Sequence, residues 1–379
     1  MLTTEEAARR LGVKVPTLYA YVSRGLLESH RDPSARGSLF DLSDVEALAI
    51  RSRGGRQTAT RLATITTAVT QLHQELGPLY RGQRATELAT RARFEDVAEL
   101  LWESGSADAD WGAPDLGPCP LVHTLDRMRW ALVVCGATDP LRSDLRPPAV
   151  TNAARRSAAA LVAAVGECPT DHAHASIAAR LAARLTPSSD AVPEEAVNAA
   201  LVLMADHELA TSTMAVRVAA SVRADPYDAL LAGLATLAGP LHGGASQMAY
   251  ELLVVAERDG AERALNDVLR EQGRLPGFGH TVYKSGDPRF GALLALAVTQ
   301  TRLGQRAVLH EVIALAAAHD VPLPNCDLAL AALSWGAGMP PDSGRTIFAV
   351  ARVAGWAAHY LEELNERPVR FRARAVYSV

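Results

Sequence analysis

The sequence is poor in features that mark several classes of protein. Its 379 residues include only four cysteines, with no C-x-x-C pair, which suits core thiols in a reducing compartment: Cys119, Cys135, Cys168 and Cys326. The first residues lack the apolar core of a secretory signal, and charged residues interrupt each alanine-rich run before it could span a bilayer. The net charge of −4 gives the whole chain no character of a polyanion binder. We therefore expect a cytoplasmic protein that is not bound to a membrane.

Signatures of metal and nucleotide sites are also missing. The sequence has no H-E-x-x-H and no close cysteine–histidine pairs, and His172 with His174 is the nearest approach to a metal site. No Walker loop or G-x-G-x-x-G follows a strand pattern. The sequence therefore predicts a protein without a metal or a bound cofactor.

The first fifty residues have the pattern of a small separate module. A capping box at Thr3–Glu6 opens a short helix that Gly12 should stop. A second helix begins near Pro16 and ends at Gly25, so that the pair forms a helix-turn-helix. Residues 28–40 place turn formers between two extended ends, which is typical of a β-wing.

A third helix should follow the capping box Ser43–Glu46, and this order resembles the winged helix-turn-helix of the MerR and excisionase type. Such a module binds DNA through its second helix and wing. The side chains expected at a DNA groove or phosphate backbone are Lys14, Thr17, Tyr21, Arg24, Arg31 and Arg36. Residues 1–56 carry nine basic and seven acidic residues, which is a weak excess for DNA binding. A role in protein contacts or dimer support therefore stays open.

Beyond the module the pattern is helical. Residues 51–56, with paired glycines and alternating arginines, can bury little and form the expected linker. Apolar residues then recur at helical spacing and few segments alternate like strands, so we expect a mainly α fold. Examples are Leu62, Ile65, Val69 and Leu72, and later Ala196, Ala199 and Leu203.

Four segments interrupt this helical chain with glycine, histidine or acidic residues: 205–208, 239–244, 276–289 and 325–327. Gly-Pro-Leu-His-Gly-Gly places His242 on a backbone that must turn sharply, with no neighbouring side chain to block a ligand. Gly-Phe-Gly-His presents a second imidazole in the same way. Two histidines, a carboxylate and several arginines suit an acidic substrate and proton transfer at carbon.

These motifs, with the Asn-x-Asp at 325–327, resemble the active-site segments of the citrate synthase family. Further similarity lies at Tyr80-Arg81-Gly82, Phe94–Ala98 and Ile347–Trp356, so the resemblance runs from about Leu79 to the C-terminus. It implies a two-domain helical fold and a homodimer or higher oligomer. The implied organisation is a module at 1–50, a linker at 51–56, a large domain at 57–245 and 334–379, and a small domain at 246–333.

The resemblance also implies roles for individual residues in joining acetyl-CoA, as a co-substrate, to oxaloacetate with release of citrate and CoA. Asp327 would take a proton from the acyl α-carbon, His242 would hydrogen-bond the enol oxygen, and His280 would polarise the ketone. The implied ligands of oxaloacetate are His207, Arg289 and Arg352, with Arg372 reaching into the partner subunit's site; those of CoA are Pro276, Gly277, Phe278, Gly279 and Lys284; and Phe348 would line the acyl pocket.

The sequence departs from the family pattern in three places. Leu209–Thr213 lacks the usual asparagine, Leu328–Ala331 replaces an aromatic pair followed by Ser-Gly, and Arg372–Arg374 is Arg-Ala-Arg instead of Arg-Pro-Arg. The second change alters the wall beside the base, so 2-methylcitrate synthesis from propionyl-CoA is an alternative. A metabolite-sensing transcriptional regulator is the other alternative, and the intact acid–base set favours the enzyme.

Overall fold

The computed structural model divides into two compact units, Met1–Thr66 and Thr67–Val379. It describes residues 2–11, 13–23, 26–27, 29–31, 38–41, 44–45, 65–105, 111–112, 114–166, 175–186 and 194–372. Several residues that the sequence analysis singled out lie outside the described residues: Gly12, Arg24, Gly25, Arg36, the linker 51–56, Leu62, Cys168, His172 and His174.

The first unit contains the predicted helix pair and wing. Helices α1 (Thr4–Leu11) and α2 (Val15–Ser23) pack beside a three-stranded antiparallel sheet of order β1-β3-β2, with bounds β1 Leu2–Thr3, β2 His30–Arg31 and β3 Ser38–Phe40. The capping box is confirmed, because the Glu6 carboxylate accepts the Thr3 N–H at 2.9 Å and the Thr3 hydroxyl oxygen accepts the Glu6 N–H at 3.4 Å. A small apolar core joins helices and sheet: Ala7, Ala8, Leu18, Leu27, Phe40 and Val45.

The second unit contains a small antiparallel sheet that the sequence analysis missed. It consists of β4 (Thr70–His73), β5 (Gly77–Tyr80) and β6 (Gln83–Arg84). The predicted helical run through Val69 and Leu72 is therefore wrong: its apolar spacing fits a helix, but the chain pairs from Thr70↔Tyr80 to His73↔Gly77 in a hairpin. Gly77, with φ of 76°, supplies the left-handed backbone that this turn requires.

The described remainder of the second unit is helical, as expected for the mainly α fold. Side chains cap several helix starts, and the Asp225 carboxylate, for example, accepts the N–H groups of Tyr227 and Asp228. The helices are α4 Ala85–Arg91, α5 Phe94–Trp102, α6 Thr124–Thr138, α7 Pro147–Ala163, α8 Ile177–Leu185, α9 Glu194–Met204, α10 Thr211–Ser221, α11 Pro226–Leu237, α12 Ala245–Asp259, α13 Ala261–Gln272, α14 Pro288–Gln300, α15 Leu303–Ala318, α16 Cys326–Gly336 and α17 Ser343–Leu364.

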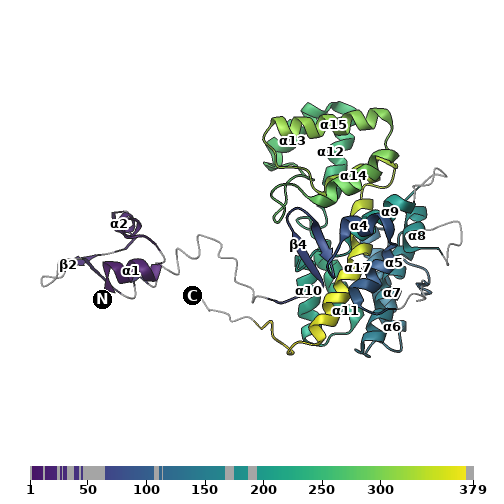
Figure 1. Ribbon diagram of the computed structural model, residues 1–379, viewed down its shortest axis with the longest axis horizontal. Helices are drawn as coiled ribbons and strands as arrows, with labels where there is room; N and C mark the ends of the chain where they lie inside the picture. Colours follow the sequence, from purple (N-terminus) through teal and green to yellow (C-terminus); the bar gives the residue numbers. More distant parts are fainter. Residues whose placement is uncertain are drawn as a thin grey trace. The chain divides into compact units, whose positions relative to one another are not determined.

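Helix α17, with 22 residues, is the central element of this unit. It runs among α5, α7, α9, α10 and α11, and nearly all of its residues from Thr346 to Tyr360 are buried (Figure 1). Helices α12 to α15 form a separate group (Figure 1), and all of their residues except Ala245 fall within 246–333, the range predicted for the small domain. That subdivision stays a prediction. Within the described residues, no helix has the length and apolarity that crossing a bilayer requires.

Candidate active site

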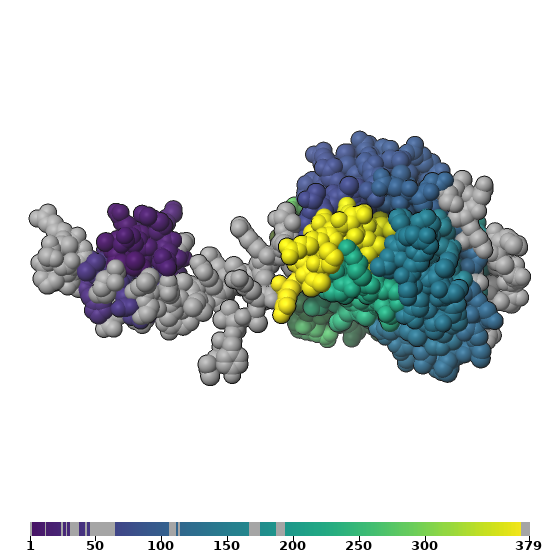
Figure 2. All heavy atoms as spheres, turned by 90° about the horizontal axis from the view of Figure 1, so that it is seen from below, coloured from purple at the N-terminus to yellow at the C-terminus, as the bar shows by residue number. Residues whose placement is uncertain are grey.

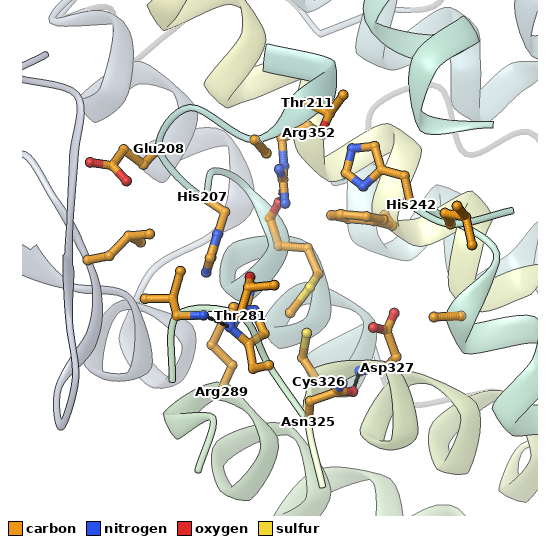
Figure 3. A pocket seen from close by; sticks show the side chains of 18 of the residues that line it. His207, Glu208, Thr211, His242, Thr281, Arg289, Asn325, Cys326, Asp327 and Arg352 are labelled. Atoms are coloured by element: carbon orange, nitrogen blue, oxygen red, sulfur yellow. Dashed lines mark hydrogen bonds between the residues drawn. The ribbon is translucent and has the colours of Figure 1, made fainter. Parts of the chain in front are cut away.

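Most of the site residues predicted for the second unit line one pocket of about 480 Å³ (Figure 3). Elements far apart in the sequence contribute to it: the turn after α9, the segment before α12, the loop before α14, the start of α16 and the first half of α17. The predicted residues that line the pocket are His207, His242, Gly279, His280, Arg289, Asp327, Phe348 and Arg352. Those that do not line it are Pro276, Gly277, Phe278, Lys284 and Arg372.

A short backbone pairing brings the His280 loop beside Asp327. The Gly279 N–H donates to the Leu323 carbonyl at 2.8 Å, and the Asn325 N–H donates to the Gly277 carbonyl at 2.9 Å. The Asn325 side chain donates to Gly279 O at 2.7 Å and accepts the Asp327 N–H at 2.9 Å, so one amide ties the two loops together. The Gly-Phe-Gly motif thus holds the His280 loop against the segment that leads into Asp327.

His280 is a neutral donor in this arrangement. Its Nδ1 accepts the backbone N–H groups of Val282 at 3.0 Å and Tyr283 at 3.2 Å, so the ring proton must lie on Nε2. Burial lowers its pKa to about 4, and the positive charge of Arg289 contributes in the same direction. The Nε2 lies 3.4 Å from a guanidinium nitrogen of Arg289, so two donors face the same space. An oxygen of an anionic ligand would satisfy both.

The two arginines of the pocket are each positioned by hydrogen bonds to neighbouring residues. Asp287 accepts from Arg289 Nε at 3.0 Å and Nη2 at 2.9 Å, and it also accepts the Cys326 N–H at 3.1 Å. Arg352 Nε donates to the Met204 carbonyl at 3.0 Å, while its guanidinium carbon lies 4.4 Å from the ring centre of Phe348. Its buried Nη1 has no hydrogen-bond partner, which leaves a charged donor for a ligand carboxylate.

His207 completes this side of the pocket. Its ring centre lies 5.2 Å from that of His280, and its buried Nε2 has no hydrogen-bond partner. Burial lowers its pKa well below the ordinary value, and the charges of Arg289 and Arg352 add to the shift. His207 is therefore neutral at pH 7 and can hydrogen-bond a ligand without adding charge.

His242 and Asp327 lie together on the other side of the pocket in Figure 3. Burial lowers the pKa of His242 to about 4 and raises that of Asp327 to about 6. His242 Nε2 lies 2.8 Å from the Ser212 hydroxyl, which also accepts the Trp356 indole N–H at 3.3 Å. A raised carboxyl pKa beside a neutral imidazole suits proton abstraction at carbon with stabilisation of the resulting oxyanion.

The sequence analysis missed two residues that hold this machinery. Ser212 stands in the segment where the family's asparagine is absent, and only the fold shows that its hydroxyl reaches His242. Asp287 lies within the segment 276–289 that the sequence analysis singled out, but it was given no role. The Asp-Pro pair, which caps α14, was its only signal.

The remaining predicted residues lie around the pocket. Lys284 is exposed and its Nζ donates to the His280 carbonyl at 3.3 Å, while Arg372 is exposed near the end of the described chain. Their roles toward CoA and a partner subunit stay predictions. Among the described residues, no group of three or more histidine, cysteine, aspartate or glutamate side chains could hold a metal ion.

The predicted DNA-facing residues differ in exposure. Lys14 and Thr17 are exposed, and Arg31 lies in β2. Tyr21 is half-buried against the core of the module, whereas Tyr19, which the sequence analysis did not name, is 47% exposed on α2.

Fold and pocket together define a mainly helical protein with an acid–base pocket rich in arginine and histidine. The chain belongs to the citrate synthase family: the model of the citrate synthase C-terminal domain matches residues 116–374. The helix-turn-helix domain matches residues 1–52. Both resemblances found in the sequence are confirmed.

Individual relatives carry two different names. Citrate synthase 2 of Bacillus subtilis is 37% identical over 47% of this chain and 50% of its own length. A 2-methylcitrate synthase of Mycobacterium tuberculosis is 30% identical over 79% of this chain and 84% of its own length. The chain thus spans about half the length of the first relatives that it matches.

A solved citrate synthase of Thermoplasma acidophilum, in a ternary complex with carboxymethyl coenzyme A and oxaloacetate, superposes with a TM-score of 0.67. It is 23% identical, and the match covers 86% of this chain and 96% of that one. This likeness establishes the fold.

Proposed function

We propose that the chain joins an acyl-CoA to oxaloacetate and hydrolyses the resulting thioester, with citrate and CoA as products when the acyl group is acetyl. One observation carries this proposal. A carboxylate and a neutral imidazole, Asp327 and His242, face a pocket whose other side carries nitrogen atoms without hydrogen-bond partners on Arg352 and His207. That pairing suits a weak carbon acid together with a dicarboxylate.

Asp327 removes the α-proton of the acyl group. A thioester α-proton is far less acidic than a carboxyl group, even one with a pKa of about 6, so the enolate must be stabilised as it forms. His242 supplies this stabilisation by donating a hydrogen bond to the thioester oxygen. Its low pKa keeps it a neutral donor, so no proton is lost from the catalytic set before the reaction.

The enolate carbon then attacks the ketone carbon of oxaloacetate. His280 donates from Nε2 to the ketone oxygen and gives a proton to the alkoxide that forms with the new carbon–carbon bond. Arg289, Arg352 and His207 bind the two carboxylates, which fixes the ketone between His280 and the enolate. Water finally cleaves the thioester to a carboxylate and the CoA thiol.

The choice of acyl donor depends on the apolar part of the pocket. Its lining includes Leu241, Ala245 and Phe348. One methylene in such a lining changes specificity by only about 1–3 kcal/mol. Acetyl-CoA is our first candidate, and propionyl-CoA, with 2-methylcitrate as product, is the alternative that the Mycobacterium tuberculosis relative favours.

Release of CoA thiol in the presence of oxaloacetate tests the proposal. The assay compares acetyl-CoA with propionyl-CoA, using the wild type and Asp327→Asn. We expect oxaloacetate-dependent release that falls about 10²- to 10⁴-fold in the variant, because it has lost the base. The donor with the higher kcat/KM identifies the substrate. If neither donor releases CoA, the proposed enzymatic activity is refuted and a metabolite-sensing role is favoured.

We also infer that a homodimer completes the site, with Arg372 serving the pocket of the second copy. Its exposure and its place outside its own pocket support this assignment. Mixing the inactive variants Asp327→Asn and Arg372→Ala should restore activity, since each mixed dimer then contains one complete site. Continued inactivity of mixed dimers would contradict a shared site.

The helix-turn-helix match and the exposed Lys14, Thr17 and Tyr19 support DNA binding as a second function of the first unit. Selection of duplexes from a random library with the full chain tests it. We expect enrichment of one sequence family that Tyr19→Ala with Thr17→Ala abolishes. Salt-sensitive retention without any sequence preference would leave protein contacts as the better assignment.

A further inference from the structure

One face of α17 continues from the pocket into a buried polar network. Phe348, Arg352, Gly355 and His359 follow one another at intervals of four, three and four residues, so they lie on the same face of the helix. The first two line the pocket, whereas His359 is fully buried and does not reach it. The proposed mechanism gives His359 no role, although buried imidazoles are costly unless hydrogen-bonded.

His359 contacts Asp206, the residue before the pocket histidine His207. Asp206 Oδ2 lies 3.3 Å from His359 Nε2 and accepts the Glu208 N–H at 3.0 Å, so it spans the turn that carries His207. Asp206 is fully buried, and a Cβ on Gly355 would lie only 2.1 Å from its Oδ1. The glycine on the shared helix face is therefore what lets this carboxylate approach α17.

Arg217 of α10 fixes the orientation of the His359 ring. Its Nη1 lies 3.0 Å from His359 Nδ1, and a guanidinium can only donate. The ring proton is therefore on Nε2, where it is donated to Asp206. Arg217 is itself fully buried and held by Glu362 and Glu363, which lie near the end of α17. That end of the helix (yellow) lies beside α10 and α11 in Figure 2.

Asp206 also acts on the pocket electrostatically. Burial lowers the pKa of Arg352, and Asp206 is the strongest opposing influence. Burial would raise the pKa of Asp206, but His359 and Arg352 hold it below its ordinary value. An ionised Asp206 thus supports the charge of Arg352, which lines the pocket and whose buried Nη1 has no hydrogen-bond partner.

We propose that His359, oriented by Arg217, is a positioning residue for the dicarboxylate substrate: it holds Asp206 in place, and Asp206 in turn sets His207 and Arg352. This inference rests on the proposed function. Because the network lies behind the carboxylate ligands and does not contact the Asp327 side of the pocket, its loss should weaken oxaloacetate binding and leave the acyl-CoA largely unaffected.

Two amide variants separate this role from a general contribution to stability. In His359→Gln the amide nitrogen reaches the position of Nε2 and keeps the donor to Asp206. In His359→Asn the shorter amide keeps the acceptor for Arg217 but loses the donor to Asp206. Both remain polar and hydrogen-bonded, and thermal unfolding of each variant verifies the fold.

Calorimetric titration with oxaloacetate alone gives the first readout, and the KM values for both substrates give the second. We expect His359→Asn to weaken oxaloacetate binding about tenfold, as for a lost hydrogen bond to a charged group, and to leave the acyl-CoA KM within about twofold. His359→Gln should stay close to wild type. The added Cβ of Gly355→Ala would meet Asp206 Oδ1 and the Ala205 carbonyl, so it displaces the turn that carries Asp206 while the His359 side chain is unchanged. This variant should reproduce the selective loss, and it keeps the test open if the Asn variant does not fold.

The possible results either support or overturn the positioning role of His359. Wild-type oxaloacetate affinity in folded His359→Asn, or equal losses in the Asn and Gln variants, would overturn the positioning role. Equal rises in both KM values would overturn it too. A wild-type protein that binds no oxaloacetate would refute the proposed function itself, and with it this inference.

Discussion

The Ser212 hydroxyl lies 2.8 Å from Nε2 of His242 and accepts the indole N–H of Trp356. Among the described residues no other group accepts the hydroxyl proton, so we infer that this proton is directed at the imidazole. This assigns the ring proton of His242 to Nδ1. A serine that belongs to no recognised motif thereby fixes the tautomer of His242, to which we assign a catalytic role.

Removing that hydroxyl should impair catalysis more than binding. We expect Ser212→Ala to lower kcat about tenfold or more, because His242 loses its fixed tautomer, with little change in the KM for oxaloacetate. Thr213→Val is the matched control, since the neighbouring Thr213 hydroxyl is buried without a hydrogen-bond partner. Steady-state kinetics of both variants test this, and equal effects on kcat would contradict it.

The acid side of the pH–rate profile should report Asp327. Its pKa is raised to about 6 by burial, and the base works only when ionised. The kcat/KM for the acyl-CoA should therefore fall with a slope of one as the pH drops below about 6. His242 and His280, with pKa values of about 4, should add no further slope above pH 5. A flat profile between pH 7 and 5 would exclude Asp327 as the titrating base.

The raised pKa of Asp327 also predicts that its ionised carboxylate lowers the free energy of unfolding. The pKa of Asp327 is higher in the folded protein than its ordinary value of 3.8, so stability is lost as the pH rises through the window from about 4 to about 6. Asp327→Asn removes a half-buried charge and should raise Tm by a few degrees at pH 7, with a smaller gain at pH 4. Asp228→Asn, at an exposed position, is the control. Differential scanning calorimetry at pH 7 and pH 4 measures the Tm of both variants and of the wild type. A gain that is independent of pH would rule out this electrostatic origin.

The ion pairs at the end of α17 should contribute strongly to the free energy of unfolding. Glu363 is fully buried and accepts from Arg217 at 2.9 Å and from Arg370 at 2.7 Å. Glu363→Ala leaves a buried guanidinium with one partner fewer, so we expect a loss of about 3–5 kcal/mol in the free energy of unfolding. Glu366→Ala, which removes a half-exposed carboxylate 3.7 Å from Arg370, should cost less than about 1 kcal/mol. Urea unfolding measures the free energy of unfolding of both variants. Similar losses would show that burial does not determine how much each carboxylate contributes to stability.

Sequence motifs predicted the pocket well because its chemistry is local. Each of His242, His280 and Asp327 stands in a short glycine- or asparagine-containing segment whose backbone must turn, so composition alone marks it. The family resemblance then supplied the order of these segments and the arginines. The pocket brings these residues together, and their individual roles stay predictions.

The residues that the sequence analysis missed depend on contacts between elements that are distant in the sequence. Ser212 and His359 act through partners from other elements, and no local pattern distinguishes them from ordinary polar residues of a helix. Asp206 lies in the marked segment 205–208, but its contact with His359 could not be read from that segment. The helix expected through Val69 and Leu72 failed for the same reason. Its spacing was right for a helix, but pairing with β5 decided the conformation.

Helix α17 also limits how the chain can change in length. Its side chains are spaced so that the pocket, the close approach at Gly355 and the ion pairs of Glu363 share one helical register. Inserting or deleting a single residue would rotate everything downstream by about 100° and turn His359 away from Asp206. Surface loops of relatives can lengthen or shorten, but the stretch from Phe348 to Glu363 should keep a constant number of residues.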